Sequence, residues 1–501
     1  MKKVIYFALA LAVVSCTQEE FNIGNDNQAD AARVLANSAD FQNFNISNHS
    51  AMLFRQASFN GIYFRGSADQ FSTTNAFSGF WDYCDQPRRQ VINSTANDDL
   101  GLQAGGPWNG FNSVINNANI VINNIENDGN EVIVSGVDVT DQELAAAYFD
   151  KAVSQGYLSM IYDKAYIVNP DTDPNALEFA TYQEMLVAAT ANMQTAISMA
   201  NGAGSFEYTL YPGGPSIDTA TFVQLSNSYL ARFTIGNART NAEAQGQDYN
   251  AILAYANAGL TADFSPPALE NVIWNELQDW SLFLLGDGAG YMPTDQKILR
   301  LFDPTYPTDY PTDTTILGEI TTDDPRAAEW YEYVGENFGF LRESRGRQLF
   351  SSYRTRKFFN GNNQNETGLP MNLFSVAEID YIKAEANLWL GNLGAAVAAL
   401  DASPRMTVGM QSTTEAAPNI LNALLYEVSI QLDLQSGIAV PWAFMRRHDM
   451  LQAGSMTMYP VPASELEITQ DAIYTFGGPA AAGEVGTASG ANDWRNINLV
   501  Y

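Results

Sequence analysis

Histidine and cysteine are scarce in this chain of 501 residues, which contains two of each. The histidines, His49 and His448, form no paired metal-binding spacing, and no lysine follows a glycine-rich loop as a phosphate cradle requires. With only Cys16 and Cys84, and with Cys16 near the N-terminus, no disulfide framework is expected. We therefore expect a large hydrophobic core, no catalytic residue, no cofactor and no resident metal.

Basic residues are also few, because 25 Lys and Arg stand against 56 Asp and Glu and give a formal net charge of -31. A nucleic-acid-binding surface needs clustered positive charge, so this class of function is excluded. An acidic surface also repels anionic lipid, so any attachment to a membrane must come from another part of the chain.

Long apolar runs are absent except at the N-terminus, where Lys2 and Lys3 precede the apolar residues 4–14. That run is too short to span a bilayer and is typical of a secretory signal peptide. It ends in Ser15-Cys16, and a small residue before such a cysteine is the pattern of a bacterial lipobox. We predict a signal peptide over residues 1–15, lipidation of Cys16 and a flexible tether over residues 16–35. An ordinary secretory signal with an incidental cysteine is the alternative.

The residues after the lipobox indicate the membrane to which the lipoprotein is delivered. Thr17 stands where an aspartate would favour retention at the inner membrane, and Gln18-Glu19-Glu20 resembles the acidic tract that sends lipoproteins of the Bacteroidetes to the cell surface. We therefore expect a protein anchored by lipid to the outer membrane and facing the cell exterior.

Helical periodicity dominates the rest of the chain, and apolar side chains recur three and four residues apart. We predict an all-α fold in which residues 36–501 form a single domain of tetratricopeptide-like helical repeats. A tight turn at residues 391–394 joins two helices within residues 376–400, and Ala384, Ala395, Ala396 and Ala399 are small enough for close antiparallel packing. Comparable pairs can be drawn at 144–200 and 219–260. The stripes are Ile115, Ala118, Ile122 and Ile125; Met185, Ala189, Met193 and Ala196; Phe222, Leu225, Tyr229 and Phe233; and Tyr249, Ile252, Leu253 and Ala256.

Several motifs, in order along the chain, resemble the SusD/RagB family. They are residues 67–70, 108–119, 377–391, Glu427, Trp442, 446–449 and 459–466. The chain departs from the family pattern at Gln435-Ser436-Gly437, so it resembles a divergent branch. The resemblance implies a non-enzymatic lipoprotein that binds a nutrient, most simply an oligosaccharide, and delivers it to a SusC-type TonB-dependent receptor in the outer membrane.

Arg446 and Arg447 belong to the motif at residues 446–449 and are conspicuous in a chain poor in positive charge. Guanidinium groups pair well with carboxylates, and Glu427 and Glu385 are available. We expect these ion pairs to lock the last helices together, which is an architectural role.

Two aromatic-rich stretches do not follow a helical period, and the resemblance implies that early loops and an insertion at about 265–375 build the ligand face. Sugar rings lie flat on aromatic side chains, while nearby polar groups bond their hydroxyls. The candidate ligand-binding residues are Trp81, Tyr83, Trp108, Asn109, Tyr291, Tyr306, Asp309 and Tyr310.

Other interpretations remain open. Many of these rings could anchor loops to the core, and Trp330 and Tyr333 could share one helix face. The ligand could be a peptide or another nutrient that is not a glycan. An acidic secreted glycoside hydrolase with two facing carboxylates, or a helical scaffold that binds only protein, would also fit the composition.

Overall fold

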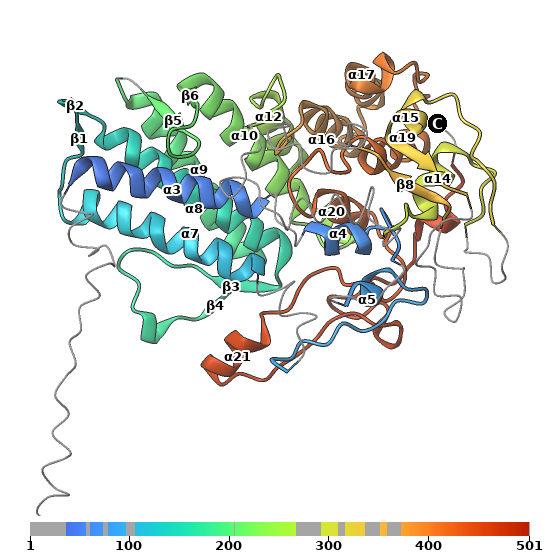
Figure 1. Cartoon of the computed structure of the whole chain (residues 1–501), viewed down its shortest axis with the longest axis horizontal. Helices are drawn as coiled ribbons and strands as arrows, with labels where there is room; N and C mark the ends of the chain where they lie inside the picture. The colour runs from blue at the N-terminus through green and yellow to red at the C-terminus, as the bar shows by residue number, and fades with distance from the viewer. Residues whose placement is uncertain are drawn as a thin grey trace, which may run out of the picture.

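The computed structural model describes residues 37–56, 61–73, 79–96, 106–204, 206–266, 292–308, 316–335, 351–357 and 372–499. Helices make up most of these residues, so the predicted all-α class is confirmed (Figure 1). One end of the molecule consists of long helices that run alongside one another, namely α3 (Ser38–Gln56), α7 (Gly106–Ile122), α8 (Thr140–Ile161) and α9 (Tyr182–Gly202). A π-helical turn at Asn123–Asn127 extends α7.

The chain then continues through shorter helices. They are α10 (Thr219–Gly236), α11 (Asn241–Gln245), α12 (Tyr249–Asn257), α16 (Val376–Trp389), α17 (Leu393–Ala402), α18 (Pro404–Thr407), α19 (Ala417–Ile430), α20 (Val440–Arg447) and α21 (Ala463–Thr469). The predicted pairs are present as α8 with α9, α10 with α12, and α16 with α17. Gly391 adopts φ 77° between α16 and α17, a left-handed conformation that favours glycine, and so permits the tight turn.

The helix starts follow from local chemistry. At α9, the Thr181 side chain accepts a hydrogen bond from the Glu184 amide while the Glu184 carboxylate accepts one from the Thr181 amide. The Asp218 side chain likewise accepts a hydrogen bond from the Thr221 amide at the start of α10. These contacts satisfy amide groups that have no partner within the helix, which fixes where each helix begins.

The predicted apolar stripes are buried, apart from the half-buried Leu253, and most of their side chains join one large core, whereas Ala118, Ile122 and Ile125 belong to a smaller cluster. Phe149 on α8 contacts Phe222 and Tyr229 on α10 at ring-centre distances of 4.9 and 5.8 Å. A smaller cluster around Phe41 packs α3 against α7 and α8. The repeat pairs therefore share their hydrophobic interior instead of forming independent units.

Strands in the described residues form four short antiparallel hairpins. These are β1 (Ile133–Val134) with β2 (Val137–Asp138), β3 (Lys164–Tyr166) with β4 (Phe179–Thr181), β5 (Glu207–Thr209) with β6 (Ser216–Asp218), and β7 (Tyr331–Tyr333) with β8 (Tyr353–Thr355). In the last pair Tyr331 lies opposite Thr355. Trp330 ends α15 (Pro325–Trp330), so Trp330 and Tyr333 do not share a helix face, contrary to expectation.

Buried cations fasten the described parts of the 265–375 insertion to the helices. Lys357 donates hydrogen bonds from Nζ to the main-chain oxygens of Ile430 and Asp433, at the end of α19, and burial lowers its pKa to about 7. Lys297, on α14 (Gln296–Phe302), donates to the Ala68 carbonyl, and burial lowers its pKa to about 8. Because the last carbonyls of a helix lack partners within it, these lysines satisfy otherwise unpaired groups.

The C-terminal arginines behave partly as predicted. Arg447 forms two hydrogen bonds to the Glu385 carboxylate, from Nε at 2.7 Å and from Nη2 at 2.6 Å, which ties α20 to α16 as expected. Arg446 instead donates to the main-chain oxygens of Gly236, Ala238 and Thr457, so its predicted carboxylate partner is wrong. Carbonyls at the end of α10 carry partial negative charge and replace the carboxylate.

Glu427 is paired with other arginines than those expected. Its carboxylate accepts hydrogen bonds from Arg326 at 2.8 and 3.1 Å, from Arg405 at 3.0 Å and from the Tyr381 hydroxyl at 3.0 Å. All of these side chains are buried. Glu427 thus joins α15 of the insertion, α16 and α18 to α19. The sequence predicted this architectural role for Glu427, but with Arg446 or Arg447 as its partner.

Candidate ligand-binding face

The short helix α5 (Phe80–Cys84) presents Trp81, the first of the candidate residues. Gly79 adopts φ 71° immediately before the helix and so redirects the chain into it. Phe80, Tyr83 and Cys84 are buried, at the helical spacing of three and four residues, whereas Trp81 and Asp82 are only half-buried on the other side. The helix therefore anchors itself through one face, and Trp81 is partly exposed on the other, although its indole nitrogen is buried.

Charged groups surround this indole. The Arg89 guanidinium lies 5.8 Å from the centre of the Trp81 ring, and its Nε lies 2.6 Å from a carboxylate oxygen of Asp85 and 3.9 Å from one of Asp82. Arg89 is 48% exposed at its side chain, so the group faces solvent. An aromatic ring beside hydrogen-bonding charges can contact the apolar face of a sugar and its hydroxyls at once.

Tyr83 and Trp108 lie in the core. Their exposed fractions are 3%, and both join a chain of rings. Tyr83 contacts Tyr459 at 6.5 Å between ring centres, Tyr459 contacts Tyr162 at 6.3 Å, and Tyr162 contacts Trp108 at 5.0 Å. A buried ring offers no face to a ligand, so these two residues support the surface from beneath and do not form a platform.

Asn109 is exposed on the first turn of α7, next to the buried Trp108. The ring contacts Tyr83–Tyr459, Tyr459–Tyr162 and Tyr162–Trp108 connect α5 to this turn. Of the early candidates, the structure thus leaves Trp81 and Asn109 accessible. The burial of Trp108 could have been predicted from the sequence, because Phe111 and Ile115 follow it at helical spacing. All three side chains are buried in the structure.

Tyr306 belongs to a separate unit, formed by the described parts of the insertion. Its side chain is 7% exposed, and its hydroxyl donates a hydrogen bond to the Gly318 carbonyl at 2.9 Å. Burial, together with the nearby hydroxyls of Tyr353 and Tyr333, raises the pKa of Tyr306. The proline-flanked ring holds the loop in place instead of facing solvent. Tyr291, Asp309, Tyr310 and the lipidation residue Cys16 lie outside the described residues.

Within the described part of the chain, no group of three or more His, Cys, Asp or Glu side chains is placed to hold a metal ion. Over the same residues, no helix combines the length and the apolar content needed to cross a bilayer. Cys84 is buried, and burial raises the pKa of its thiol well above the usual value. A thiol in this state is a poor nucleophile, which agrees with a packing role.

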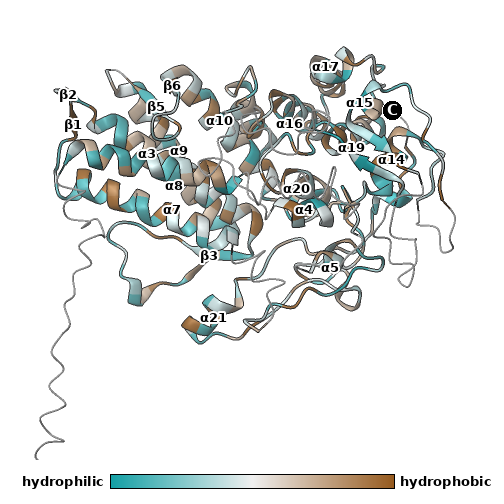
Figure 2. Cartoon of the chain, viewed as in Figure 1, coloured by the Kyte–Doolittle hydropathy of each residue, from teal (hydrophilic) through white to brown (hydrophobic). Residues whose placement is uncertain are grey.

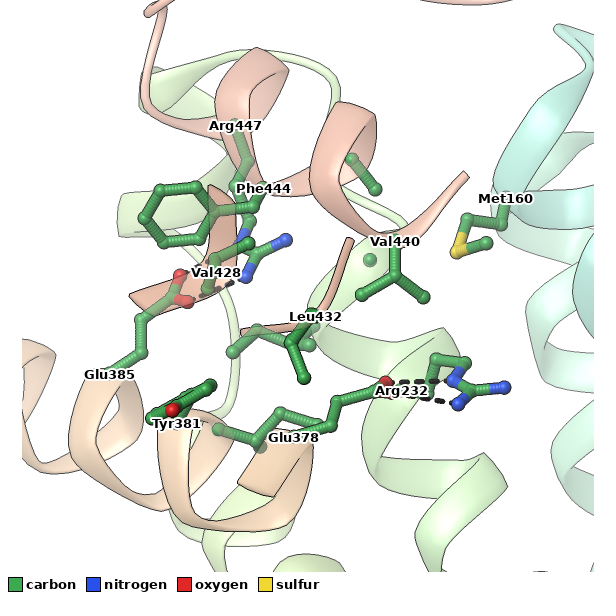
Figure 3. A pocket seen from close by; sticks show the side chains of 14 residues that line it. Met160, Arg232, Glu378, Tyr381, Glu385, Val428, Leu432, Val440, Phe444 and Arg447 are labelled. Carbon is green, nitrogen blue, oxygen red and sulfur yellow. Dashed lines mark hydrogen bonds and ion pairs between the residues drawn. The ribbon is translucent and has the colours of Figure 1, made fainter. Parts of the chain in front are cut away.

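A small cavity of about 20 Å³ lies between α10, α16, α19 and α20 (Figure 3). Figure 3 shows two ion pairs at its wall, Arg232 with Glu378 and Arg447 with Glu385, while apolar side chains such as Val428 and Leu432 make up most of the rest. A space of this size holds about one water molecule. It is too small for a sugar ring, so this cavity is not a candidate site for a glycan.

The arrangement of antiparallel helix pairs with an inserted, loop-rich unit defines a class of fold, and structural comparison identifies it as SusD-like. A SusD homologue from Bacteroides thetaiotaomicron VPI-5482 has a TM-score of 0.57 at 15% identity, over 87% of this chain and 97% of that one. A SusD-like carbohydrate-binding protein from Bacteroides vulgatus ATCC 8482 has a TM-score of 0.55 at 15% identity, over 85% of each chain. A laminarin-binding SusD-like protein has a TM-score of 0.54 at 14% identity, over 88% of this chain and 99% of that one.

The sequence itself gives no comparable match, since no protein-family profile and no curated protein matches it. The structural likeness spans most of this chain and nearly the full length of the solved proteins. This chain therefore has the SusD-like fold, which confirms at the level of fold the resemblance carried by its motifs.

Proposed function

We propose that this protein is a surface-exposed outer-membrane lipoprotein that binds a nutrient, in the first place an oligosaccharide, and delivers it to a SusC-type TonB-dependent transporter. The observation that carries the proposal is the SusD-like fold over most of the chain, together with the solved relatives described as carbohydrate-binding and laminarin-binding. The N-terminal sequence adds the anchor, since residues 4–14 and Cys16 have the pattern of a lipoprotein signal.

The ligand face proposed here is centred on Trp81, with Arg89, Asp82 and Asn109 as hydrogen-bonding groups. Trp81 is half-buried, so packing holds its indole in place while part of the side chain is exposed to solvent. A ring fixed in this way loses little conformational freedom when ligand binds. Tyr83 and Trp108, being buried, act by supporting this surface. Tyr291, Asp309 and Tyr310 stay candidates for the same ligand.

Calorimetric titration tests the ligand face. A glycan screen of the full chain first selects an oligosaccharide, with laminarin among the probes and peptides as the competing class. Trp81→Ala should then weaken binding about tenfold to a hundredfold, by analogy with aromatic hot spots at other interfaces, whereas Trp81→Phe should retain most of the affinity. Both variants should keep the helical circular dichroism of the parent protein. Equal affinity of Trp81→Ala and the parent would remove Trp81 from the site.

Affinity purification tests the transporter. The tagged protein, solubilised from outer membranes in mild detergent, should bring down a barrel receptor of the SusC type in a defined ratio. Repeated recovery of the chain alone would contradict this part of the proposal without affecting glycan binding.

A further inference from the structure

His49 lies in the interior of the molecule, at the end that the long helices form. It belongs to α3, which packs beside α8, and both helices carry hydrophilic as well as hydrophobic residues (Figure 2). The His49 side chain is 2% exposed, and Asp150 on α8 is fully buried beside it. His49 Nε2 lies 3.5 Å from one oxygen of the Asp150 carboxylate. Neither residue belongs to the proposed ligand face.

The other ring nitrogen fixes the tautomer of His49. Nδ1 lies 2.9 Å from the main-chain oxygen of Thr209, on β5. A carbonyl oxygen only accepts, so Nδ1 carries a hydrogen and donates it. In a neutral imidazole Nε2 is then an acceptor, and it is buried without a hydrogen-bond partner among the described residues. The Tyr208 ring stacks on the imidazole at 4.4 Å between ring centres, which holds the plane of the imidazole.

The Asp150 carboxylate meets this nitrogen with its less well-bonded oxygen. Oδ1 accepts a hydrogen bond from the Tyr208 hydroxyl at 2.8 Å. Oδ2 lies 3.5 Å from the side-chain nitrogen of Asn48 and 3.5 Å from His49 Nε2. An ionised carboxylate oxygen and an imidazole nitrogen without a hydrogen are both acceptors, so they would repel each other here. A proton between Oδ2 and Nε2 removes this repulsion.

The elements packed against the pair bring no positive charge to it. In the described part of the chain no Lys or Arg forms an ion pair with Asp150, and the ammonium group of Lys151, the next residue on α8, donates to the Asn169 side chain at 2.8 Å. The other acid is Glu143, also buried on α8, whose negative charge disfavours ionisation of Asp150. The remaining polar neighbours are uncharged amides and a hydroxyl, namely Asn45 and Asn48 on α3, Asn117 on α7 and Tyr208 on β5.

We propose that His49 and Asp150 form a neutral dyad, which holds one proton between Nε2 and Oδ2 and latches α3 and β5 to α8, and that this latch weakens as the pH rises. The proton is held on Asp150, because a neutral acid beside a neutral imidazole avoids two buried charges. Loss of the proton leaves a buried carboxylate facing an acceptor nitrogen. The latch acts on the stability of the long helices and does not depend on the proposed ligand or transporter.

The direction of the pH dependence follows from the protons that the folded and unfolded chains bind. Burial raises the pKa of Asp150 well above its usual value and lowers the pKa of His49 to about 4, so the folded pair holds one proton from about pH 4 upwards. In the unfolded chain, with ordinary pKa values of about 3.9 and 6.5, the two residues hold one proton between those values and none at higher pH. The dyad therefore leaves stability unchanged between about pH 4 and 6.5 and lowers it as the pH rises further, because folding must then take up a proton.

Nuclear magnetic resonance of the imidazole nitrogens tests the dyad directly, because the chain has only two histidines. In protein labelled with nitrogen-15 histidine, the signals of His49 are assigned by their loss in His49→Gln or their retention in His448→Gln. They should show a hydrogen on Nδ1 alone and should stay unchanged from pH 8 to pH 5. An imidazolium at pH 7, a neutral ring with its hydrogen on Nε2, or titration near pH 6.5 would overturn the proposal.

Differential scanning calorimetry tests the pH dependence. Asp150→Asn keeps an oxygen for the Tyr208 hydroxyl and supplies an amide that can donate to Nε2, but it holds no titratable proton. Between pH 6.5 and 8 the melting temperature of the parent should therefore fall by about 1 to 2 °C relative to that of Asp150→Asn. The matched control is Asp141→Asn, the same change at an exposed position of α8, which should follow the parent. Equal pH dependence of the parent and Asp150→Asn would refute the latch, and the imidazole signals of the parent decide the proposal even if Asp150→Asn does not fold.

Discussion

Replacing Glu427 with glutamine removes the charge that two buried arginines share. Its carboxylate is fully buried and contacts Arg326 and Arg405 at 2.8 and 3.0 Å. Arg326 keeps a second partner in Asp324, at 2.7 Å, but the ion pair with Glu427 is the only one that Arg405 makes in the described residues. The variant Glu427→Gln therefore leaves Arg405 as a buried cation without a counter-charge.

Breaking a buried ion pair on one side costs about 3 to 5 kcal/mol, because the remaining charge stays out of water without compensation. Unfolding entropy near the melting temperature is roughly 2 cal/mol/K per residue, so a chain of this length has roughly 1 kcal/mol/K. The melting temperature of Glu427→Gln should therefore fall by roughly 3 to 5 °C. Differential scanning calorimetry at pH 7, on protein lacking the signal peptide, measures this shift.

Glu332 provides a matched control for this experiment. It also pairs with two arginines, Arg354 and Arg356, at 2.7 and 2.6 Å, but its side chain is 39% exposed. Solvent screens such a pair, so Glu332→Gln should shift the melting temperature by less than about 1 °C. Equal shifts for the two variants, or a stable Glu427→Gln, would refute the argument that burial decides the value of these ion pairs.

Three further predictions follow from other residues. Although burial opposes ionisation of Glu385, the charges of Arg447 and His448 hold its pKa at about 2, below the usual 4.5. The stabilisation that this shift provides is complete above about pH 4.5 and is lost as the pH falls towards 2. The stability difference between the parent and Glu385→Gln should therefore shrink over that interval in thermal melts. Cys16→Ala should release the protein from membranes and abolish palmitate labelling; unchanged attachment would remove the lipid anchor. Trp108→Ala should lower the melting temperature markedly through loss of core packing, whereas Trp81→Ala should not. A larger fall in melting temperature for Trp81→Ala than for Trp108→Ala would contradict the burial assigned to these rings.

Much of the helical architecture could be predicted from the sequence, because side chains that recur every three or four residues need only a local period to be recognised. The stripe at Phe222, Leu225, Tyr229 and Phe233 is buried as α10, and the turn at Gly391 joins α16 to α17. Glu385, one of the two carboxylates proposed from the sequence as partners for the arginines, does pair with Arg447. The partners of Arg446 could not be predicted, because they are carbonyls at the end of α10, which come close to Arg446 only when the tertiary structure forms.

The candidate ligand face was harder to predict, because exposure of an aromatic ring in a loop depends on where that loop folds back. Tyr83 and Tyr306 stand among polar and proline residues, as an exposed ring would, but both are buried by segments distant in sequence.

The buried cations have a consequence for how this protein meets other molecules at a distance. Of the 19 Lys and Arg in the described residues ten are buried, against 12 of the 41 Asp and Glu there. Folding thus withdraws positive charge from the exterior more completely than negative charge. The electrostatic field that an approaching molecule experiences is more uniformly negative than the composition suggests, and it extends over about 8 Å at physiological ionic strength. Basic partners are drawn in before any contact forms, and that attraction weakens as salt is added.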